Sequence, residues 1–278
     1  MAAKRFQCAL LVFCLLLSLV GCGAQDPIGF CVEILDVGQS DCTLITADGS
    51  TLMIDAGTSS ARHAVQGYLS ERRVKHVDYL LLTHPHEDHV GNARMLIETD
   101  TVGALILPPT AEDLLDWQLI LNAAAKKEIP VYTAAAGDVY SVGGATLEIL
   151  QVWVEAENVN DQSVICRVTY GSVSCLFTAD AEKEGEARLL ANVFADRLDC
   201  DLLKAGHHGS ETSSCEALLL ATTPTYAAVS CGINNEYGFP HKALTERLVA
   251  AQIEYHRTDT DGTLTYKSDG ESLWLEKG

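Results

Sequence analysis

The feature that most constrains this chain is a run of histidines and acids at the end of an apolar segment. The run, HPHEDH, directly follows residues 77–83, VDYLLLT. Continuous apolar character predicts a buried strand, and the His and Pro after it mark the strand's end. In extended backbone His84 and His86 point to the same side and can reach one cation. Asp88 and His89 can face a second cation where the chain turns into a helix. Imidazole with carboxylate suits Zn, Mn or Fe, so the run predicts a metal site.

Segments of strand and helix character alternate along the chain in two similar halves. Apolar and β-branched runs in the first half predict strands near 30–36, 42–46, 51–55, 77–83 and 102–107, with helices near 60–72, 90–98 and 111–127. The second half predicts strands near 138–142, 145–154, 163–170, 173–178, 199–204, 225–231, 253–257, 262–267 and 271–276, with helices near 182–195, 213–221 and 241–251. Mixed halves of this kind predict an α/β fold of two packed sheets flanked by helices. No linker rich in Pro, Ser or Gly divides them, so residues 30–278 are expected to form one domain.

The N-terminus has the pattern of an export signal. Lys4 and Arg5 precede the apolar core 8–20, which as a helix would be about 20 Å long and too short to span a bilayer. The segment Leu19-Val20-Gly21-Cys22 resembles the bacterial lipobox, in which the Cys is lipidated and becomes the new N-terminus. We therefore expect residues 1–21 to be a lipoprotein signal peptide and 22–29 to be the lipidated Cys22 with a short linker. The alternative is an ordinary secretory signal. A lipid anchor would hold the protein on the extracytoplasmic face of a bacterial cell membrane.

The charge balance restricts the partners of the protein. The chain has 19 basic and 38 acidic residues, a formal net charge of −19. Removal of Lys4 and Arg5 with the signal would take the charge to −21, because no acid lies in that segment. A surface this acidic repels polyphosphate at long range. Stable, non-specific binding of nucleic acid is therefore not expected unless a metal or a local basic patch supplies the attraction.

The order of several further motifs carries a family resemblance. The pattern H-x-H-x-D-H after a strand resembles the metallo-β-lactamase superfamily of metallohydrolases. The more specific segments, in chain order, are Asp36-Val37-Gly38-Gln39-Ser40-Asp41, Met53-Ile54-Asp55-Ala56-Gly57, Phe177-Thr178-Ala179-Asp180, His207-His208-Gly209-Ser210 and Tyr237-Gly238-Phe239-Pro240-His241. Together they are similar to the extracellular hydrolase domain of the ComEC/Rec2 competence family, over about residues 30–276. The resemblance implies a four-layer αββα sandwich, here as a free-standing, lipid-tethered relative without the multi-span channel part.

The resemblance also implies a ligand set for two divalent cations, Zn or Mn. One cation would be bound by His84 and His86, and the other by Asp88 and His89. Asp180 would bridge the two, although the residue alone could equally cap the helix predicted at 182–195. In the adjacent pair His207 and His208, only one side chain can readily bind the same ion. We assign His207 as the ligand and His208 to the substrate or a leaving group, with the reverse assignment left open.

The chain departs from the family pattern in two places. No His lies between His89 and His207 to complete the first cation's ligands. The chain has Asn158, Asn160, Asp161 and Gln162 instead, as in the competence group, so the first cation is expected to be weakly held, present only with substrate, or Mn. In addition, Gly238-Phe239-Pro240 stands where the competence family often has Gly-His-Pro. His241 just beyond either contacts substrate or caps the helix predicted at 241–251.

Two early aspartates and one lysine complete the candidates. Asp36 and Asp55 end predicted strands and either orient ligand imidazoles and loop amides through hydrogen bonds or only form turns with the glycines that follow. We favour the orienting role for Asp55 and leave Asp36 open. Lys204 either pairs with a substrate phosphate or is a solvated residue at a strand end.

The site as a whole predicts a metal-dependent hydrolase. Cations lower the pKa of bound water and polarise the scissile ester, so a metal-activated hydroxide replaces a Ser or Cys nucleophile. Asp88, His208 and His241 are the predicted catalytic residues. The competence resemblance favours a phosphodiesterase or nuclease whose substrate is a phosphoester, either single-stranded DNA or a small phosphodiester. The alternatives are a hydrolase of lactones, lactams or thioesters in the same superfamily, and a non-catalytic metal-binding lipoprotein.

Overall fold

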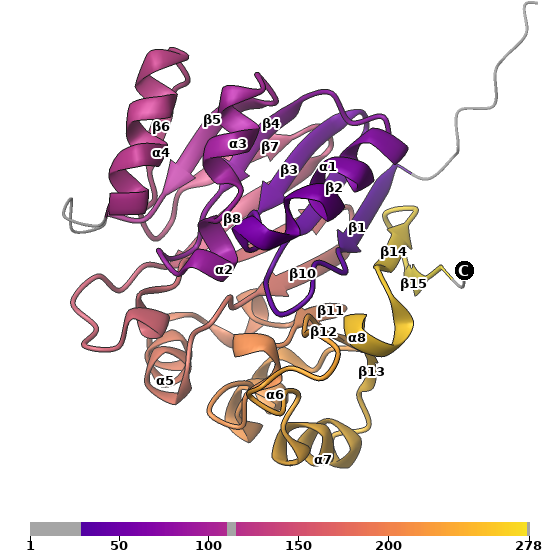
Figure 1. The fold of residues 1–278 in the computed structure, drawn as a ribbon. Coiled ribbons are helices and arrows are strands. Elements are labelled where there is room, and N and C mark those ends of the chain that lie inside the picture. Colours follow the sequence, from indigo (N-terminus) through magenta and orange to yellow (C-terminus); the bar gives the residue numbers. More distant parts are fainter. Residues whose placement is uncertain (1–28, 110–114, 277–278) are drawn as a thin grey trace, which may run out of the picture.

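A computed structural model describes residues 29–109 and 115–276 (Figure 1). The predicted signal peptide and the lipidation site Cys22 lie outside these residues. Within the two described ranges, no helix combines the length and the apolar character needed to cross a bilayer. The seven cysteines of the described residues are free thiols, and five of them are buried.

The strands form two mixed sheets. The first sheet has the order β15-β14-β1-β2-β3-β4-β5-β6 and the second β13-β12-β11-β10-β9-β8-β7. The strands of the first are β1 (Phe30–Ile34), β2 (Thr43–Ala47), β3 (Ser50–Ile54), β4 (Val77–Leu81), β5 (Val102–Leu107), β6 (Val131–Thr133), β14 (Leu264–Ser268) and β15 (Leu273–Leu275). Those of the second are β7 (Val139–Val142), β8 (Ala145–Gln151), β9 (Ile165–Tyr170), β10 (Val173–Phe177), β11 (Leu202–Lys204), β12 (Tyr226–Val229) and β13 (Glu254–Arg257).

Helices cover the outer face of each sheet. The first sheet packs against α1 (Arg62–Glu71), α3 (Ala93–Glu98) and α4 (Leu115–Lys126). The second packs against α5 (Lys183–Asn192), α6 (Glu216–Thr222) and α7 (Lys242–Ala250). Figure 1 shows the two helix groups on opposite sides of the paired sheets, with the short helices α2 (Glu87–Val90) and α8 (Thr258–Asp261) in the connections. This is the predicted four-layer αββα sandwich, and the fold prediction is confirmed.

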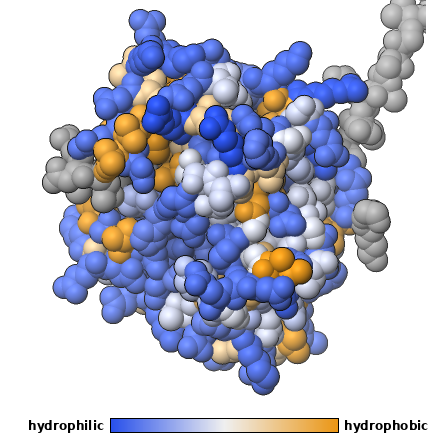
Figure 2. Space-filling view, in the orientation of Figure 1, coloured by the Kyte–Doolittle hydropathy of each residue, from blue (hydrophilic) through white to orange (hydrophobic). Residues whose placement is uncertain are grey.

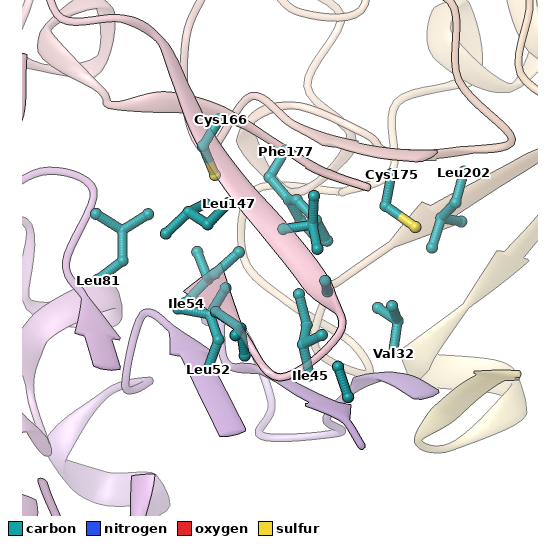
Figure 3. Packing of buried hydrophobic residues seen from close by; sticks show 14 of the residues in the cluster. Val32, Ile45, Leu52, Ile54, Leu81, Leu147, Cys166, Cys175, Phe177 and Leu202 are labelled. Carbon is teal, nitrogen blue, oxygen red and sulfur yellow. The ribbon is translucent and has the colours of Figure 1, made fainter. Parts of the chain in front are cut away.

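The main core lies between the two sheets. Val32, Ile45 and Leu52 project from the first sheet toward Leu147 and Phe177 of the second, and all five are buried (Figure 3). Residues at alternate positions of these strands face the helices instead, because side chains along a strand alternate between its two faces. Burial on both faces explains why the strands read as nearly continuous apolar runs.

The structure departs from the prediction at a few elements. β6 was not predicted, because its three residues are exposed at the edge of the first sheet and form no apolar run. The helix predicted near 90–98 corresponds to α3, which begins at Ala93, whereas the short helix α2 before it and α8 were not predicted. These elements are short, and tertiary contacts rather than local periodicity define them.

The carboxyl ends of parallel strands meet at one edge of the sandwich. β3, β4, β5 and β6 are parallel in the first sheet, and β10, β11, β12 and β13 are parallel in the second. The loops after β4, β10 and β11 carry the His-rich run, Asp180 and the pair His207 and His208. The fold therefore brings together motifs that lie more than a hundred residues apart in the sequence.

A buried carboxylate on α5 supports the loop after β11. Glu186 accepts hydrogen bonds from the backbone N–H groups of Ser214 and Cys215. The Ser214 hydroxyl in turn accepts a hydrogen bond of 3.0 Å from the N–H of Gly206. Burial raises the pKa of Glu186, and the hydrogen bonds from Cys215 and Ser214 only partly offset that effect. The carboxylate thus fixes one end of the segment that contains the histidine pair, and the Ser214 hydroxyl joins this end to Gly206 at the other.

Glu186 gives the first testable prediction. Because its pKa is raised in the folded protein, the folded state binds this proton more readily than the unfolded chain does. Its contribution to the free energy of unfolding should therefore fall as the pH rises above about 4.3, the ordinary value for Glu. Glu186→Gln cannot titrate, so the wild type should lose stability relative to this variant as the pH rises, in urea denaturation at a series of pH values. A difference that stays constant, or that grows in favour of the wild type, would contradict the prediction.

Candidate metal centre

The first two histidines of the run lie together beside Asp180. His84 Nε2 is 3.1 Å from His86 Nδ1 and 3.8 Å from Asp180 Oδ2. Ligand atoms of these three residues all lie within 4.8 Å of one another. His84 is fully buried, whereas His86 is exposed. One side of this group is therefore open to solvent.

A second group lies on the other side of the same carboxylate. His89 Nε2 is 3.3 Å from Asp180 Oδ1, and His208 Nε2 is 3.1 Å from Asp88 Oδ2 and 3.7 Å from Asp180 Oδ2. These four residues also have ligand atoms within 4.8 Å of one another. Asp180 thus belongs to both groups, as the resemblance implied. Its side chain accepts no bond from the start of α5, for which Glu182 is the N-cap residue.

The structure differs from the sequence prediction at the histidine pair. His208, and not His207, lies in the second group, where its side chain is only 2% exposed. His207 lies beside the group, with Nε2 3.9 Å from Asp180 Oδ2 and Nδ1 3.5 Å from Glu182 Oε1. Both residues have positive φ, 47° and 52°. Two consecutive left-handed residues turn the chain so that the second side chain points inward, and no local sequence pattern indicates this turn.

Asp55 orients His89. Its carboxylate accepts hydrogen bonds of 2.8 Å from the backbone N–H and the hydroxyl of Thr83, and its Oδ2 lies 2.8 Å from His89 Nδ1. With Nδ1–H donated to Asp55, His89 presents Nε2 to the second group. This is the orienting role favoured from the sequence. Asp36, in contrast, is exposed and accepts only a 3.4 Å hydrogen bond from the N–H of Gly38, so it forms the turn.

A buried ion pair lies behind His208, and sequence reasoning missed it. Lys204 Nζ donates a hydrogen bond to Asp41 Oδ2, and Asp41 Oδ1 is 3.2 Å from His208 Nδ1. His208 Nδ1 also lies 3.1 Å from the carbonyl oxygen of Ser230. Burial alone would raise the pKa of Asp41, but Lys204 and His208 outweigh it and lower that pKa. Lys204 is therefore neither solvated nor free to contact a phosphate. The motif that contains Asp41 was recognised, but its partner lies 163 residues away.

The segment that replaces the missing histidine supplies no ligand. The amides of Asn158 and Asn160 donate hydrogen bonds of 3.1 and 2.8 Å to Glu182 Oε1. Asp161 Oδ1 accepts from the N–H groups of Glu182 and Gly185 at 2.8 and 3.0 Å. This segment therefore positions the loop after Asp180 and the first turn of α5. Gln162 donates to the carbonyl oxygen of Ala156, outside both groups.

His241 also lies outside both groups. It occupies the N-cap position of α7, but its side chain makes no capping hydrogen bond. Instead its Nδ1 accepts from the N–H of Glu211 at 3.0 Å, and its Nε2 lies 3.1 Å from the carbonyl oxygen of Tyr237. His241 therefore joins two loops at the start of α7, where its backbone carbonyl accepts the first hydrogen bonds of the helix, and its contact with substrate stays a prediction.

The charges and unsatisfied atoms fit a cation. Burial alone would lower the pKa of His89, but Asp180 and Asp55 raise it well above its ordinary value. Burial would raise the pKa of Asp180, but His89 and His208 hold it well below its usual range. His89 Nε2 and Asp180 Oδ1, which lie 3.3 Å apart, are fully buried and make no hydrogen bond among the described residues. Buried polar atoms are rarely left unpaired, and a mixed imidazole and carboxylate donor set suits Zn, Mn or Fe. These residues therefore fit a divalent cation.

Comparison with known proteins identifies the family. Residues 35–233 match the model of the metallo-beta-lactamase superfamily. The match covers more than half of the chain and includes every residue of the two groups. The chain belongs to this superfamily.

Individual relatives confirm the resemblance to competence proteins. The chain is 29% identical to ComE operon protein 3 of Bacillus subtilis over 85% of its own length and 33% of that protein. It is 31% identical to Recombination protein 2 of Haemophilus influenzae over 83% of its length and 28% of that protein. The chain therefore spans about a third of the length of these relatives. In fold it is similar to the metallo-beta-lactamase fold protein YhfI of Bacillus subtilis, with a TM-score of 0.59, 12% identity, and coverage of 89% of this chain and 100% of YhfI.

The buried ion pair gives a prediction on stability. Lys204→Met would remove the lysine partner of the buried Asp41, and breaking such a pair from one side costs about 3–5 kcal/mol. We expect a loss of this size in the free energy of unfolding, measured by urea denaturation. The double variant Asp41→Asn with Lys204→Met removes both charges and should recover part of the loss. If the single variant is as stable as the wild type, or the double variant is less stable than the single one, the pair does not have this role.

Proposed function

We propose that this superfamily member is a two-metal phosphodiesterase. The observation that carries the proposal is the pair of ligand groups on either side of one shared carboxylate, Asp180. Two divalent cations bound there, Zn or Mn, would polarise a scissile ester and lower the pKa of a bound water. The similarity to competence proteins supports a phosphodiester as the substrate.

The protein's own residues would hold this site rigidly. His84, His86 and Asp180 would bind one cation, and Asp88, His89, Asp180 and His208 the other. Asp55 fixes the ring of His89, and Asp41 with the Ser230 carbonyl fixes that of His208. A preorganised set of this kind does not need to rearrange when charge develops in the transition state.

His207 is the residue best placed to meet the substrate. Its side chain is 23% exposed, so it reaches solvent at the rim of the second group. Its Nδ1 faces the Glu182 carboxylate, which Asn158 and Asn160 hold in place. We assign His207 to contact with the substrate phosphate or with the leaving group, the role first predicted for His208.

The charge of the protein favours a small substrate. The net charge is −19, and hydrophilic residues predominate on the face shown in Figure 2. Long duplex DNA would be repelled by such a surface. A small phosphodiester, or the end of a single strand, has few phosphates outside the metal site and is compatible with it.

The two histidines of the pair give the test of the proposal. His208→Ala should empty the second group and abolish hydrolysis of bis(p-nitrophenyl) phosphate with Zn or Mn. His207→Ala should keep the metal and slow turnover by about 10² to 10⁴, the usual size of a proton-transfer contribution. Metal content and kcat are measured side by side, with His63→Ala, an exposed histidine of α1, as the matched control.

Three outcomes would change the account. Loss of metal in His207→Ala but not in His208→Ala would reverse the two roles. Unchanged metal content in both variants would show that neither histidine is a metal ligand. If the metal-loaded wild type hydrolyses a lactone or thioester but no phosphodiester, the substrate belongs to another class.

We further propose that Cys22 carries a lipid anchor, on the basis of the lipobox-like segment 19–22. A Cys22→Ala chain should remain uncleaved or leave the membrane fraction, because the acyl acceptor is missing. Fractionation of cells with detection of the protein by immunoblot measures this. Cleavage and membrane association equal to the wild type would contradict the lipoprotein assignment.

A further inference from the structure

An aromatic stack extends outward from the second ligand group. The ring of Phe239 is 6.4 Å from that of His208 with an interplanar angle of 27°, and Tyr237 stacks on Phe239 at 5.4 Å and 18°. The rings of His207 and His241 meet Phe239 edge-on at 5.6 and 4.9 Å. Three nearly parallel rings thus lead from a proposed metal ligand to the surface.

The loop that carries these rings is held in place. The side chain of Asn235 accepts a hydrogen bond from the N–H of Phe239 at 2.9 Å and donates to the carbonyl oxygens of Gly232 and Phe239 at 2.9 and 2.7 Å. The carbonyl oxygen of Tyr237 lies 3.1 Å from His241 Nε2. The aromatic rings are therefore presented by a loop whose backbone is braced from within.

The outer part of the loop exposes apolar surface. Tyr237 is 58% exposed and Ile233 is 74% exposed. Exposed apolar groups that cluster beside a candidate active site mark a binding surface more often than isolated ones do. Aromatic rings accept other flat rings by stacking, and this attraction does not depend on the charge of the protein. Stacking is therefore a source of affinity that an acidic protein can offer to an anionic substrate.

We propose that Tyr237, backed by the ring of Phe239, forms a stacking platform for a nucleobase of a substrate whose phosphodiester lies at the metal site. A base is joined to its phosphate through one sugar, and the ring of Phe239 lies between the ring of Tyr237 and that of His208, a member of the second ligand group. The proposed substrate is then a nucleoside phosphodiester or the end of a single strand. This inference rests on the proposed phosphodiesterase function and specifies its substrate.

Two esters with the same leaving group test the platform. Thymidine 5′-(p-nitrophenyl phosphate) and methyl p-nitrophenyl phosphate both lose p-nitrophenolate as the oxygen of water replaces it on phosphorus. The ratio of their kcat/KM values therefore isolates the contribution of the nucleoside. Equilibrium binding of adenosine 5′-monophosphate, measured by calorimetry with and without added metal, is a second readout that needs no turnover.

We expect the wild type to prefer the thymidine ester. Tyr237→Leu should lower that preference, and the affinity for adenosine 5′-monophosphate, by about 5- to 100-fold, the range of base stacking on one aromatic side chain. Tyr237→Trp should retain both. Phe194→Leu is the matched control, because Phe194 is an aromatic residue, 79% exposed, located beyond the C-terminal end of α5.

The outcomes separate the platform from the proposed function. If both esters are hydrolysed with no preference for the thymidine ester, the platform is overturned and the phosphodiesterase function stands. The same conclusion follows if Tyr237→Leu retains both the preference and the nucleotide affinity of the wild type. If neither ester is hydrolysed, the proposed function fails. Binding of adenosine 5′-monophosphate then decides the platform alone: a Kd that Tyr237→Leu raises supports it, and an equal Kd or no binding overturns it.

Discussion

The buried carboxylate of Asp180 is the point on which the rest of the site depends. It follows β10 of the second sheet, yet its oxygens lie 3.8 Å from His84 Nε2 and 3.3 Å from His89 Nε2, which belong to the loop of the first sheet. A buried carboxylate without compensating charge is strongly unfavourable. Asp180 can therefore be buried only where imidazoles or a cation surround it. Such a position exists where the carboxyl ends of the strands of the two sheets meet.

Buried acids outside the proposed ligand set fix the orientation of the proposed ligand side chains. Asp55 fixes His89 from one side, and Asp41, itself paired with Lys204, fixes His208 from the other. Glu186 holds the loop that follows the histidine pair. Each of these three acids is buried. The arrangement is typical of metal sites in which outer hydrogen bonds hold each ligand ring in one orientation.

Much of the fold could be predicted from the sequence because its strands are buried on both faces. Such strands read as apolar runs, and the run HPHEDH after β4 contains four of the six residues of the two ligand groups. β6 could not be predicted, since its exposed residues carry no apolar signal. The family resemblance, and not periodicity, indicated that Asp180 would join the His-rich run.

The details that the sequence could not supply arise from backbone turns and distant contacts. The choice between His207 and His208 depends on two consecutive positive φ angles. The pairing of Asp41 with Lys204 joins the loop between β1 and β2 to β11 of the other sheet. The role of Asn158 and Asn160 depends on Glu182, which accepts their hydrogen bonds. In each case the residue type indicated a functional role, but the sequence around the residue did not indicate which groups it contacts in the folded protein.

We propose that two cations bind, one on either side of Asp180. The most direct test is anomalous diffraction from crystals of the protein grown with Mn²⁺ or Zn²⁺, recorded at the absorption edge of the metal. We expect two anomalous peaks that share Asp180, one bound by His84 and His86 and the other by Asp88, His89 and His208. A peak bound by His207 in place of His208, or no peak at Asp180 in fully metal-loaded crystals, would contradict it.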